Sequence, residues 1–183
     1  MRRRLILIIV LIAAVGSAAT IAFTASDPPG TVSDKTGSSK KSAGRSLGSV
    51  AGLSFDGFGR SEKVELDAMR GKPLVLNYWA SWCPFCISEM PDFQNVYERV
   101  SDRVEFLGVN IQDDVGEAKH LARVTGVRYP LAVDPDGDVY RRLRGFSMPT
   151  TWFIDAKGRI VERFSGPLDA EQLADRITEH FGS

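Results

Sequence analysis

The two cysteines of the chain, Cys83 and Cys86, are separated by two residues in the stretch Trp79-Ala-Ser-Trp-Cys-Pro-Phe-Cys. They stand where an apolar run ends and a helix-like pattern begins. Two thiols at this spacing can form a disulfide and exchange it with a second pair, by attack of a thiolate on a disulfide sulfur. Thiol–disulfide exchange is therefore the first chemistry that the sequence suggests.

Other roles of a Cys-x-x-Cys pair make demands that the sequence does not meet. A structural zinc site needs about four ligands, and the two histidines, His120 and His180, are far from the pair in sequence. Attachment of a c-type haem requires histidine directly after the second cysteine, where this chain has Ile87. A purely structural disulfide would close a very short loop and contribute little stability. We therefore expect neither a metal nor a cofactor at this pair.

The residues on either side of the pair predict the elements that position it. Residues 74–79 form a nearly unbroken apolar run, typical of a strand buried on both faces. Apolar residues then recur every three or four positions, which predicts a helix over 84–100, with Pro84 in its first turn and a kink at Pro91.

The start of a helix is a favourable place for a thiolate. The unpaired N–H groups and the dipole at a helix N-terminus stabilise a negative charge and lower the pKa of a thiol there. Cys83 is therefore the expected nucleophile. Cys86 lies one turn further on, on the apolar face of the helix, and suits a buried resolving thiol.

Glu89 follows Cys86 by three positions and is flanked on its helix face by Met90 and Phe93. Two interpretations remain open. Glu89 is either a partly exposed acid at the border of the apolar stripe, or a desolvated carboxyl group of raised pKa that exchanges protons with Cys86. Asn77, the inward polar residue of the preceding strand, cannot titrate, so a buried acid that serves this site would be Glu89.

The rest of the chain alternates between strand and helix patterns. The expected strands cover residues 53–55, 63–66, 104–111, 129–133, 150–154 and 160–164. The expected helices cover residues 115–125, 139–143 and 168–181. The first two strands would form a small hairpin or paired edge strands, and the last two a closing hairpin. This order predicts an α/β fold with a mixed central sheet flanked by helices.

Two proline-containing segments allow a functional and an ordinary interpretation. Met148-Pro149 precedes an apolar strand, where proline is normally only an edge residue. Beside a Cys-x-x-Cys pair, however, a cis bond would let Met148 pair with an extended substrate chain. The acidic segment 134–138 resembles a calcium loop, but its glycine stands at the wrong position, so we expect a turn.

The N-terminal region carries the pattern of an export segment. Three arginines precede an uncharged apolar run over residues 5–25, long enough for a membrane anchor, and a small-residue site at residues 17–19 leaves cleavage open. Residues 1–25 are thus an expected signal anchor, with the remainder of the chain placed outside the cytoplasm. Residues 26–48 are rich in Pro, Gly, Ser and Lys and are expected to be a flexible linker.

Charge divides the chain in the same place. Residues 1–48 carry seven Lys and Arg against two Asp, a net charge of +5, whereas residues 49–183 carry sixteen against twenty-one Asp and Glu, a net charge of −5. Because the body is mildly acidic, it has no basic footprint for nucleic acid.

Several motifs, in this order, resemble the thioredoxin superfamily and its membrane-tethered branch of TlpA-, ResA- and DsbE-like thiol–disulfide oxidoreductases. The similar stretches are Gly71-Lys-Pro-Leu-Val-Leu-Asn-Tyr-Trp-Ala-Ser-Trp-Cys-Pro-Phe-Cys86, Glu89-Met-Pro91, Gly108-Val-Asn110 and Met148-Pro-Thr-Thr-Trp-Phe-Ile-Asp155. The resemblance implies a thioredoxin-like domain over 49–183, with an N-terminal β-hairpin and an inserted αβ unit within 111–137.

The resemblance also implies roles for individual residues. Cys83, Cys86 and Glu89 would be the catalytic residues, and Pro149 would be cis. The remaining site residues would support the pair or contact the substrate. Those expected to support the pair are Trp82, Pro84, Phe85 and Pro149, and those expected to contact the substrate are Trp79, Met148 and, again, Pro149.

The implied function is an extracytoplasmic thiol–disulfide oxidoreductase without cofactor. As a reductase it would act on exported cysteine-containing proteins, such as apocytochrome c, and be recharged by a membrane thiol carrier. An oxidase that introduces disulfides into exported proteins is the alternative, because Pro84-Phe85 departs from the dipeptides usual in reducing relatives. A non-catalytic binding module is the third hypothesis.

Overall fold

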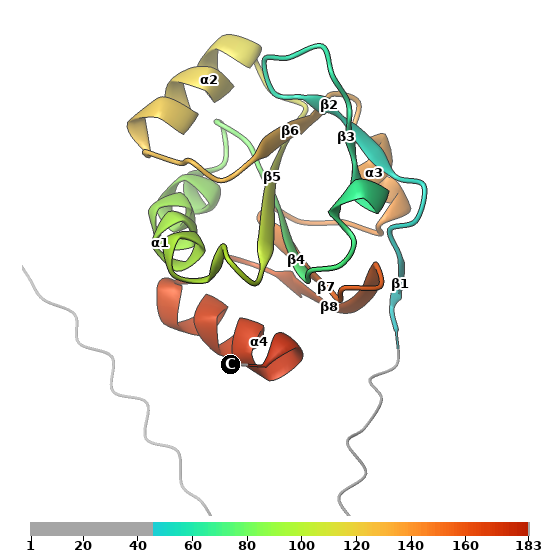
Figure 1. The fold of residues 1–183 in the computed structure, drawn as a ribbon. Coiled ribbons are helices and arrows are strands. Elements are labelled where there is room, and N and C mark those ends of the chain that lie inside the picture. The colour runs from blue at the N-terminus through green and yellow to red at the C-terminus, as the bar shows by residue number, and fades with distance from the viewer. Residues whose placement is uncertain (1–45, 183) are drawn as a thin grey trace, which may run out of the picture. The chain divides into compact units, whose positions relative to one another are not determined.

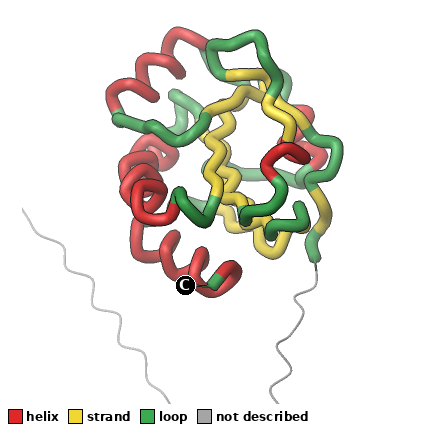
Figure 2. Tube along the Cα trace, viewed as in Figure 1, coloured by secondary structure: helices red, strands yellow, loops and turns green. Residues whose placement is uncertain are grey.

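The computed structural model describes residues 46–182, which form one eight-stranded mixed sheet with helices on both faces (Figures 1 and 2). The strands are β1 (Gly48–Ser49), β2 (Ser54–Gly57), β3 (Val64–Glu65), β4 (Leu74–Trp79), β5 (Glu105–Ile111), β6 (Leu131–Asp134), β7 (Thr150–Ile154) and β8 (Arg159–Ser165). The helices are α1 (Pro84–Val100), α2 (Val115–Val124), α3 (Asp138–Arg142) and α4 (Ala170–Phe181), with a 3₁₀ helix η1 (Leu66–Met69).

The expected N-terminal anchor, residues 1–25, and residues 26–45 of the expected linker lie outside the described range. Between residues 46 and 182, none of the helices combines the length and the apolar character needed to cross a bilayer.

The strand order is β1-β8-β7-β4-β5-β6-β2-β3. β4 runs parallel to β5, and β5 runs parallel to β6, whereas β7 pairs with β4 in the antiparallel sense. The mixed α/β sheet is thereby confirmed. The carboxyl ends of β4 and β5 and the amino end of β7 meet at one edge of the sheet, because Trp79 pairs with Asn110 and Tyr78 with Thr150.

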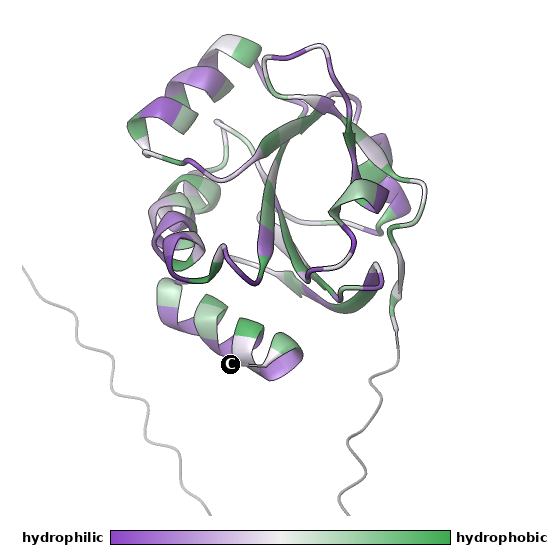
Figure 3. Ribbon diagram, viewed as in Figure 1, coloured by the Kyte–Doolittle hydropathy of each residue, from purple (hydrophilic) through white to green (hydrophobic). Residues whose placement is uncertain are grey.

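Alternating side chains of β4 contact different layers. Val75 packs in one cluster with Phe93 of α1 and Leu173 of α4, and these two helices lie side by side in Figure 1. Tyr78, which points to the other face, contacts the rings of Tyr140 in α3 and Trp152 in β7 at centroid distances of 4.9 and 5.4 Å. Figure 3 shows the resulting pattern, with hydrophobic residues in the central strands and hydrophilic residues along the outer helices.

Most of the expected elements are confirmed. The helix over 84–100 and the strands over 74–79 and 150–154 match to the residue. β2 pairs antiparallel with β3 as the expected hairpin, and the inserted αβ unit consists of α2 and β6. The acidic segment 134–138 forms the expected turn, in which Gly137 has a positive φ of 71°.

The differences lie at element ends. α4 begins at Ala170 rather than at residue 168, because Asp169 and Gln172 form a capping box there. β1 pairs Gly48, the last residue of the expected linker, with Ile160. β1 could not be predicted, because its two residues pair through main-chain groups and are too few to give a periodic pattern of side chains. η1 was not predicted either.

Gly108 is required by close packing inside the sheet. A Cβ atom at this position would lie 2.7 Å from Leu131 Cδ2, 2.9 Å from Tyr129 Cε2 and 3.2 Å from Trp79 Nε1. We expect Gly108→Ala to lower the free energy of unfolding by about 1–3 kcal/mol, as overpacking does. Urea unfolding of both proteins in the oxidised state measures the difference, and an unchanged midpoint would contradict it.

Candidate active site

Cys83 and Cys86 form a disulfide at the start of α1. Cys83 is the N-cap of this helix, with extended backbone angles, and its Sγ accepts a hydrogen bond of 3.2 Å from the backbone N–H of Cys86. Pro84 occupies the first turn, where its missing N–H leaves no bond unmade. Cys83 is 5% exposed and Cys86 is fully buried. Of the two sulfurs, that of Cys83 is therefore the more accessible and is the one next to unpaired helix N–H groups.

Glu89 is a buried carboxyl group, with 2% of its surface exposed. Its Oε1 accepts a hydrogen bond of 2.8 Å from Asn77 Nδ2, and its Oε2 accepts one of 3.0 Å from the backbone N–H of Leu168. Burial raises the pKa of Glu89 from 4.5 to about 8, although both hydrogen bonds act in the opposite direction. The interpretation of Glu89 as a partly exposed border acid is therefore wrong.

The helix register places Glu89 close to the resolving thiol. Residues three apart on a helix lie on one face, so Glu89 follows Cys86 on the buried side of α1. Asn77 fixes the orientation of the carboxyl group, because its amide also donates to Thr151 Oγ1 at 3.1 Å. A buried titratable group thus lies one helical turn beyond Cys86, on the same face of α1.

The peptide bond between Met148 and Pro149 is cis, as the resemblance implies. Because Thr150 pairs with Tyr78, Pro149 lies at the sheet edge from which the chain continues to Cys83. The carbonyl of Pro149 accepts a hydrogen bond of 3.0 Å from Gly166 N–H. Met148 is half-buried and packs against the core.

The aromatic residues of the motif differ sharply in exposure. Trp82 and Phe85, expected to support the pair, are 56% and 62% exposed. Trp79, expected to contact substrate, is fully buried and packs against Phe58 at a centroid distance of 5.9 Å. The substrate-binding expectation for Trp79 is thus wrong for this structure, because the apolar end of β4 continues into the core. Trp82 and Phe85 supply the exposed apolar surface beside Cys83.

A second loop, not recognised from the sequence, holds the segment that leads to Cys83. Asp113 accepts hydrogen bonds from Ser81 N–H at 2.5 Å and from Ser81 Oγ at 2.6 Å, and Trp82 Nε1 donates to Gln112 O at 3.2 Å. The sequence held an indirect indication of this contact. Gln112-Asp113 comes directly after β5, which runs parallel to β4, so the residues that follow the two strands lie at the same edge of the sheet.

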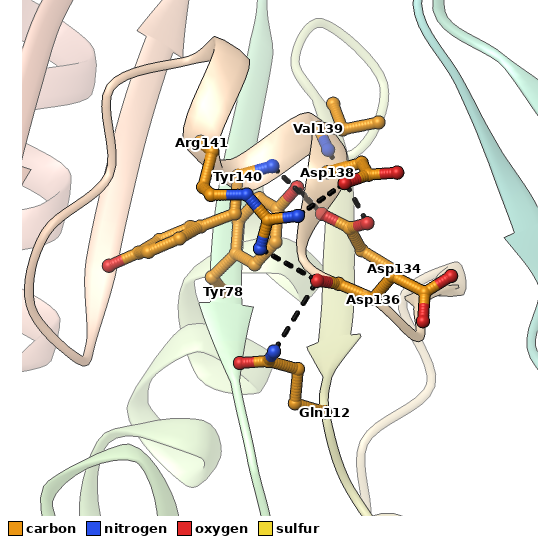
Figure 4. A network of polar contacts seen from close by, with 8 residues as sticks. All are labelled: Tyr78, Gln112, Asp134, Asp136, Asp138, Val139, Tyr140 and Arg141. Carbon is orange, nitrogen blue, oxygen red and sulfur yellow. Dashed lines mark hydrogen bonds and ion pairs between the residues drawn. The ribbon is translucent and has the colours of Figure 1, made fainter.

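Figure 4 shows a network of polar contacts around Asp134 that joins residues of β4, β6 and α3. Asp134 is buried and accepts hydrogen bonds from Tyr78 OH at 2.9 Å and from Tyr140 N–H at 2.8 Å. Tyr140 OH in turn donates to Ser147 O at 2.5 Å, one residue before Met148. The turn expected over 134–138 therefore connects β4 with the loop that carries the cis proline.

These features define the class of protein: a thioredoxin-fold thiol–disulfide oxidoreductase with one Cys-x-x-Cys pair at a helix N-terminus. The chain belongs to the AhpC/TSA family, whose model matches residues 53–163. The resemblance stated from the motifs is thereby confirmed.

Individual relatives agree with this class. Thiol-disulfide oxidoreductase ResA of Bacillus thuringiensis is 26% identical over 117 residues, which cover 63% of this chain and 68% of the relative. Sporulation thiol-disulfide oxidoreductase A of Bacillus subtilis is 29% identical over 114 residues, covering 60% and 69%. The crystal structure of a DsbF homologue from Corynebacterium diphtheriae aligns with a TM-score of 0.66 and 26% identity, covering 76% of this chain and 88% of that one.

Proposed function

We propose that this oxidoreductase works as a reductase of disulfides in proteins outside the cytoplasm. Cys83 is its nucleophile, Cys86 its resolving thiol and Glu89 the group that takes the proton of Cys86. The observation that carries these roles is the buried carboxyl group of Glu89, whose pKa is about 8, on the helix face of Cys86. The reducing direction is inferred from the resemblance to ResA-like proteins.

The reducing cycle has two exchange steps. The Cys83 thiolate attacks one sulfur of the substrate disulfide, and the other substrate sulfur leaves as a thiolate. Cys86 then gives its proton to Glu89 and attacks the Cys83 sulfur. This step closes the Cys83–Cys86 disulfide, releases the second substrate thiol and transfers two electrons to the substrate.

Only the second step requires an internal base. Cys86 is buried, so water does not readily remove its proton. A carboxyl group with a pKa of 4.5 is a weak base toward a thiol whose ordinary pKa is about 8.5, whereas a carboxyl with a pKa of about 8 nearly matches it. In an oxidising cycle the thiolate that resolves the mixed disulfide comes from the substrate, and Cys86 leaves as a thiolate. Glu89 would return its proton to that thiolate, so the matched pKa assists proton transfer at Cys86 in both directions, and the reduction potential decides which direction prevails.

One structural observation favours the oxidising direction. Cys83 caps α1, a position that stabilises its thiolate, and stabilisation of the reduced form makes a dithiol pair more oxidising. An oxidase that forms disulfides in exported proteins is therefore the second candidate.

The cellular location and the partners are inferred from the sequence pattern and the family. Residues 1–25 would anchor the chain, with the domain on the extracytoplasmic side, or would be removed to release a secreted protein. Exported cysteine-containing proteins are the proposed substrates, with apocytochrome c as the first candidate. A membrane thiol–disulfide carrier would return electrons to the pair.

The reduction potential separates the two candidates. We expect a value nearer to that of thioredoxin, about −270 mV, than to the strongly oxidising value of about −120 mV. Equilibration of the full chain with redox buffers, followed by alkylation of free thiols, measures the potential. A value at the oxidising end would replace the reductase with the oxidase.

A further inference from the structure

The loop between β5 and α2 makes a set of polar contacts that the exchange cycle itself does not use. Asp113 binds Ser81 through both carboxylate oxygens, with Oδ2 accepting from the backbone N–H at 2.5 Å and Oδ1 from the hydroxyl group at 2.6 Å. Ser81 lies two residues before Cys83, and Cys83 N–H donates to Ala80 O at 3.2 Å. A single side chain thus holds the turn that presents the first cysteine.

The carboxylate is itself held from within the protein. Asn110 is 2% exposed, and its Nδ2 donates to Asp113 Oδ2 at 2.8 Å. The same Nδ2 lies 3.5 Å from Trp79 O, at the end of β4. Hydrogen bonds to an ionised acceptor are stronger than those between neutral groups, and a buried donor fixes their geometry.

The backbone next to Asp113 has an unusual conformation that serves the same contact. Gln112 has a φ of 46°, in the left-handed region that non-glycine residues rarely adopt. In this conformation its carbonyl oxygen accepts the indole N–H of Trp82, the residue directly before Cys83. Both residues that precede the first cysteine are therefore bound by one short segment of the inserted αβ unit.

We propose that Asp113 is a positioning residue for thiol–disulfide exchange, acting through Ser81 to hold Cys83 at the N-cap of α1. The proposal rests on Cys83 as the attacking sulfur, as in the proposed function. Thiolate stabilisation at a helix N-terminus falls off within one turn, so a small displacement of Cys83 would weaken it. Among the hydrogen bonds of residues 46–182, Asp113 is the only charged side chain that binds the turn over residues 80–83 that leads into α1, called here the entry turn.

A purely electrostatic role of Asp113 would have the opposite consequence. A carboxylate near a thiolate disfavours the thiolate, so removing the charge would speed up the reaction of Cys83. The positioning role predicts a slower reaction after removal of the carboxylate, and also after removal of the Ser81 hydroxyl group, which leaves the charge in place. The two roles therefore differ in sign.

The test compares four variants of the full chain: Asp113→Ala, Ser81→Ala, their double mutant and Asp114→Ala. The last is a matched control, because the side chain of Asp114 caps α2 by accepting from Gly116 N–H and Glu117 N–H and makes no hydrogen bond to the entry turn. Each protein is reduced, freed of reductant and mixed at pH 7 with the uncharged disulfide 4,4′-dithiodipyridine. The second-order rate constant and the thiolate absorbance as a function of pH are recorded.

We expect Asp113→Ala to react at least about tenfold more slowly, with a higher pKa of Cys83, and Ser81→Ala to change both in the same direction by less. The double mutant should be no slower than Asp113→Ala, because both substitutions remove the same contact. Asp114→Ala should stay within about twofold of the wild type. Asp113→Asn keeps one acceptor oxygen and should therefore react faster than Asp113→Ala. It replaces Asp113→Ala in the comparison if that variant does not fold.

Two results would overturn the proposal. A faster reaction of Asp113→Ala would assign the carboxylate an electrostatic role, and equal loss in Asp113→Ala and Asp114→Ala would assign it a purely structural one. A different result would contradict the proposed function itself. A Cys83→Ser protein that reacts as fast as the wild type would show that Cys83 is not the attacking sulfur.

Discussion

Replacing Cys86 with serine is expected to leave the chain covalently bound to its substrates. Cys83 would still attack the substrate disulfide, since its sulfur is the accessible one and lies at the N-cap of α1. Serine cannot resolve the mixed disulfide, so the intermediate would accumulate and turnover would fall by at least about a thousandfold. Electrophoresis without reductant, followed by mass spectrometry of the adducts, detects the captured proteins.

The control for this experiment is the reciprocal variant. Cys83→Ser should capture nothing, because the remaining sulfur of Cys86 is fully buried. Adducts formed equally by both variants would contradict the assignment of nucleophile and resolving thiol. The absence of adducts with either variant would support a binding module that does not exchange disulfides.

The second large effect is expected from Glu89→Gln. Glutamine keeps the size of the side chain but cannot take a proton from Cys86. Internal proton transfer typically contributes a factor of about 10²–10⁴, so resolution of the mixed disulfide should slow by roughly a hundredfold at neutral pH. The rate profile of the wild type should show an ionisation near pH 8, the pKa of Glu89, which the variant lacks. Stopped-flow measurements of Trp fluorescence across pH 5–10 record both.

The same substitution should change how stability depends on pH. Between pH 4.5 and 8 the folded protein keeps the proton of Glu89, whereas the unfolded chain loses it. The unfolded state therefore binds fewer protons, and stability falls as the pH rises through this window, by up to about 5 kcal/mol. Glu89→Gln should lack this decrease, as denaturant unfolding of the oxidised protein at pH 5 and pH 8 will show.

Glu98→Gln is the matched control for both measurements. Glu98 lies on the same helix but is half-exposed and paired with Arg128, so its charge is far better solvated. Its replacement should leave the rate profile and the pH dependence of stability unchanged. If the two glutamine variants behave alike, Glu89 has no special role in proton transfer.

The sequence predicted the elements that carry a strong side-chain pattern. β4 and β7 are apolar runs buried on both faces, and α1 has a regular apolar stripe with proline in its first turn. Glu89 could be selected because it interrupts that stripe beside Cys86. These features are local, so they can be recognised without knowing the tertiary structure.

Features that depend on tertiary contacts could not be predicted in this way. Trp79, at the end of β4, is covered by Phe58, a contact between segments that are distant in sequence. Asp113 binds Ser81 only because two parallel strands end together. The partner of Glu89 in the main chain, Leu168 N–H, is 79 positions away in sequence.

The short loop that leads into α4 contacts two parts of the site at once. Gly166 N–H binds the carbonyl of Pro149, and two residues later Leu168 N–H binds the carboxyl of Glu89. Surface loops usually accept inserted residues at little cost, which makes them convenient places for tags and fused domains. This loop is an exception, because an insertion between Gly166 and Leu168 would pull the proton acceptor and the cis-proline strand out of register with each other. Protein engineering of this chain should therefore leave residues 166–168 at their native length.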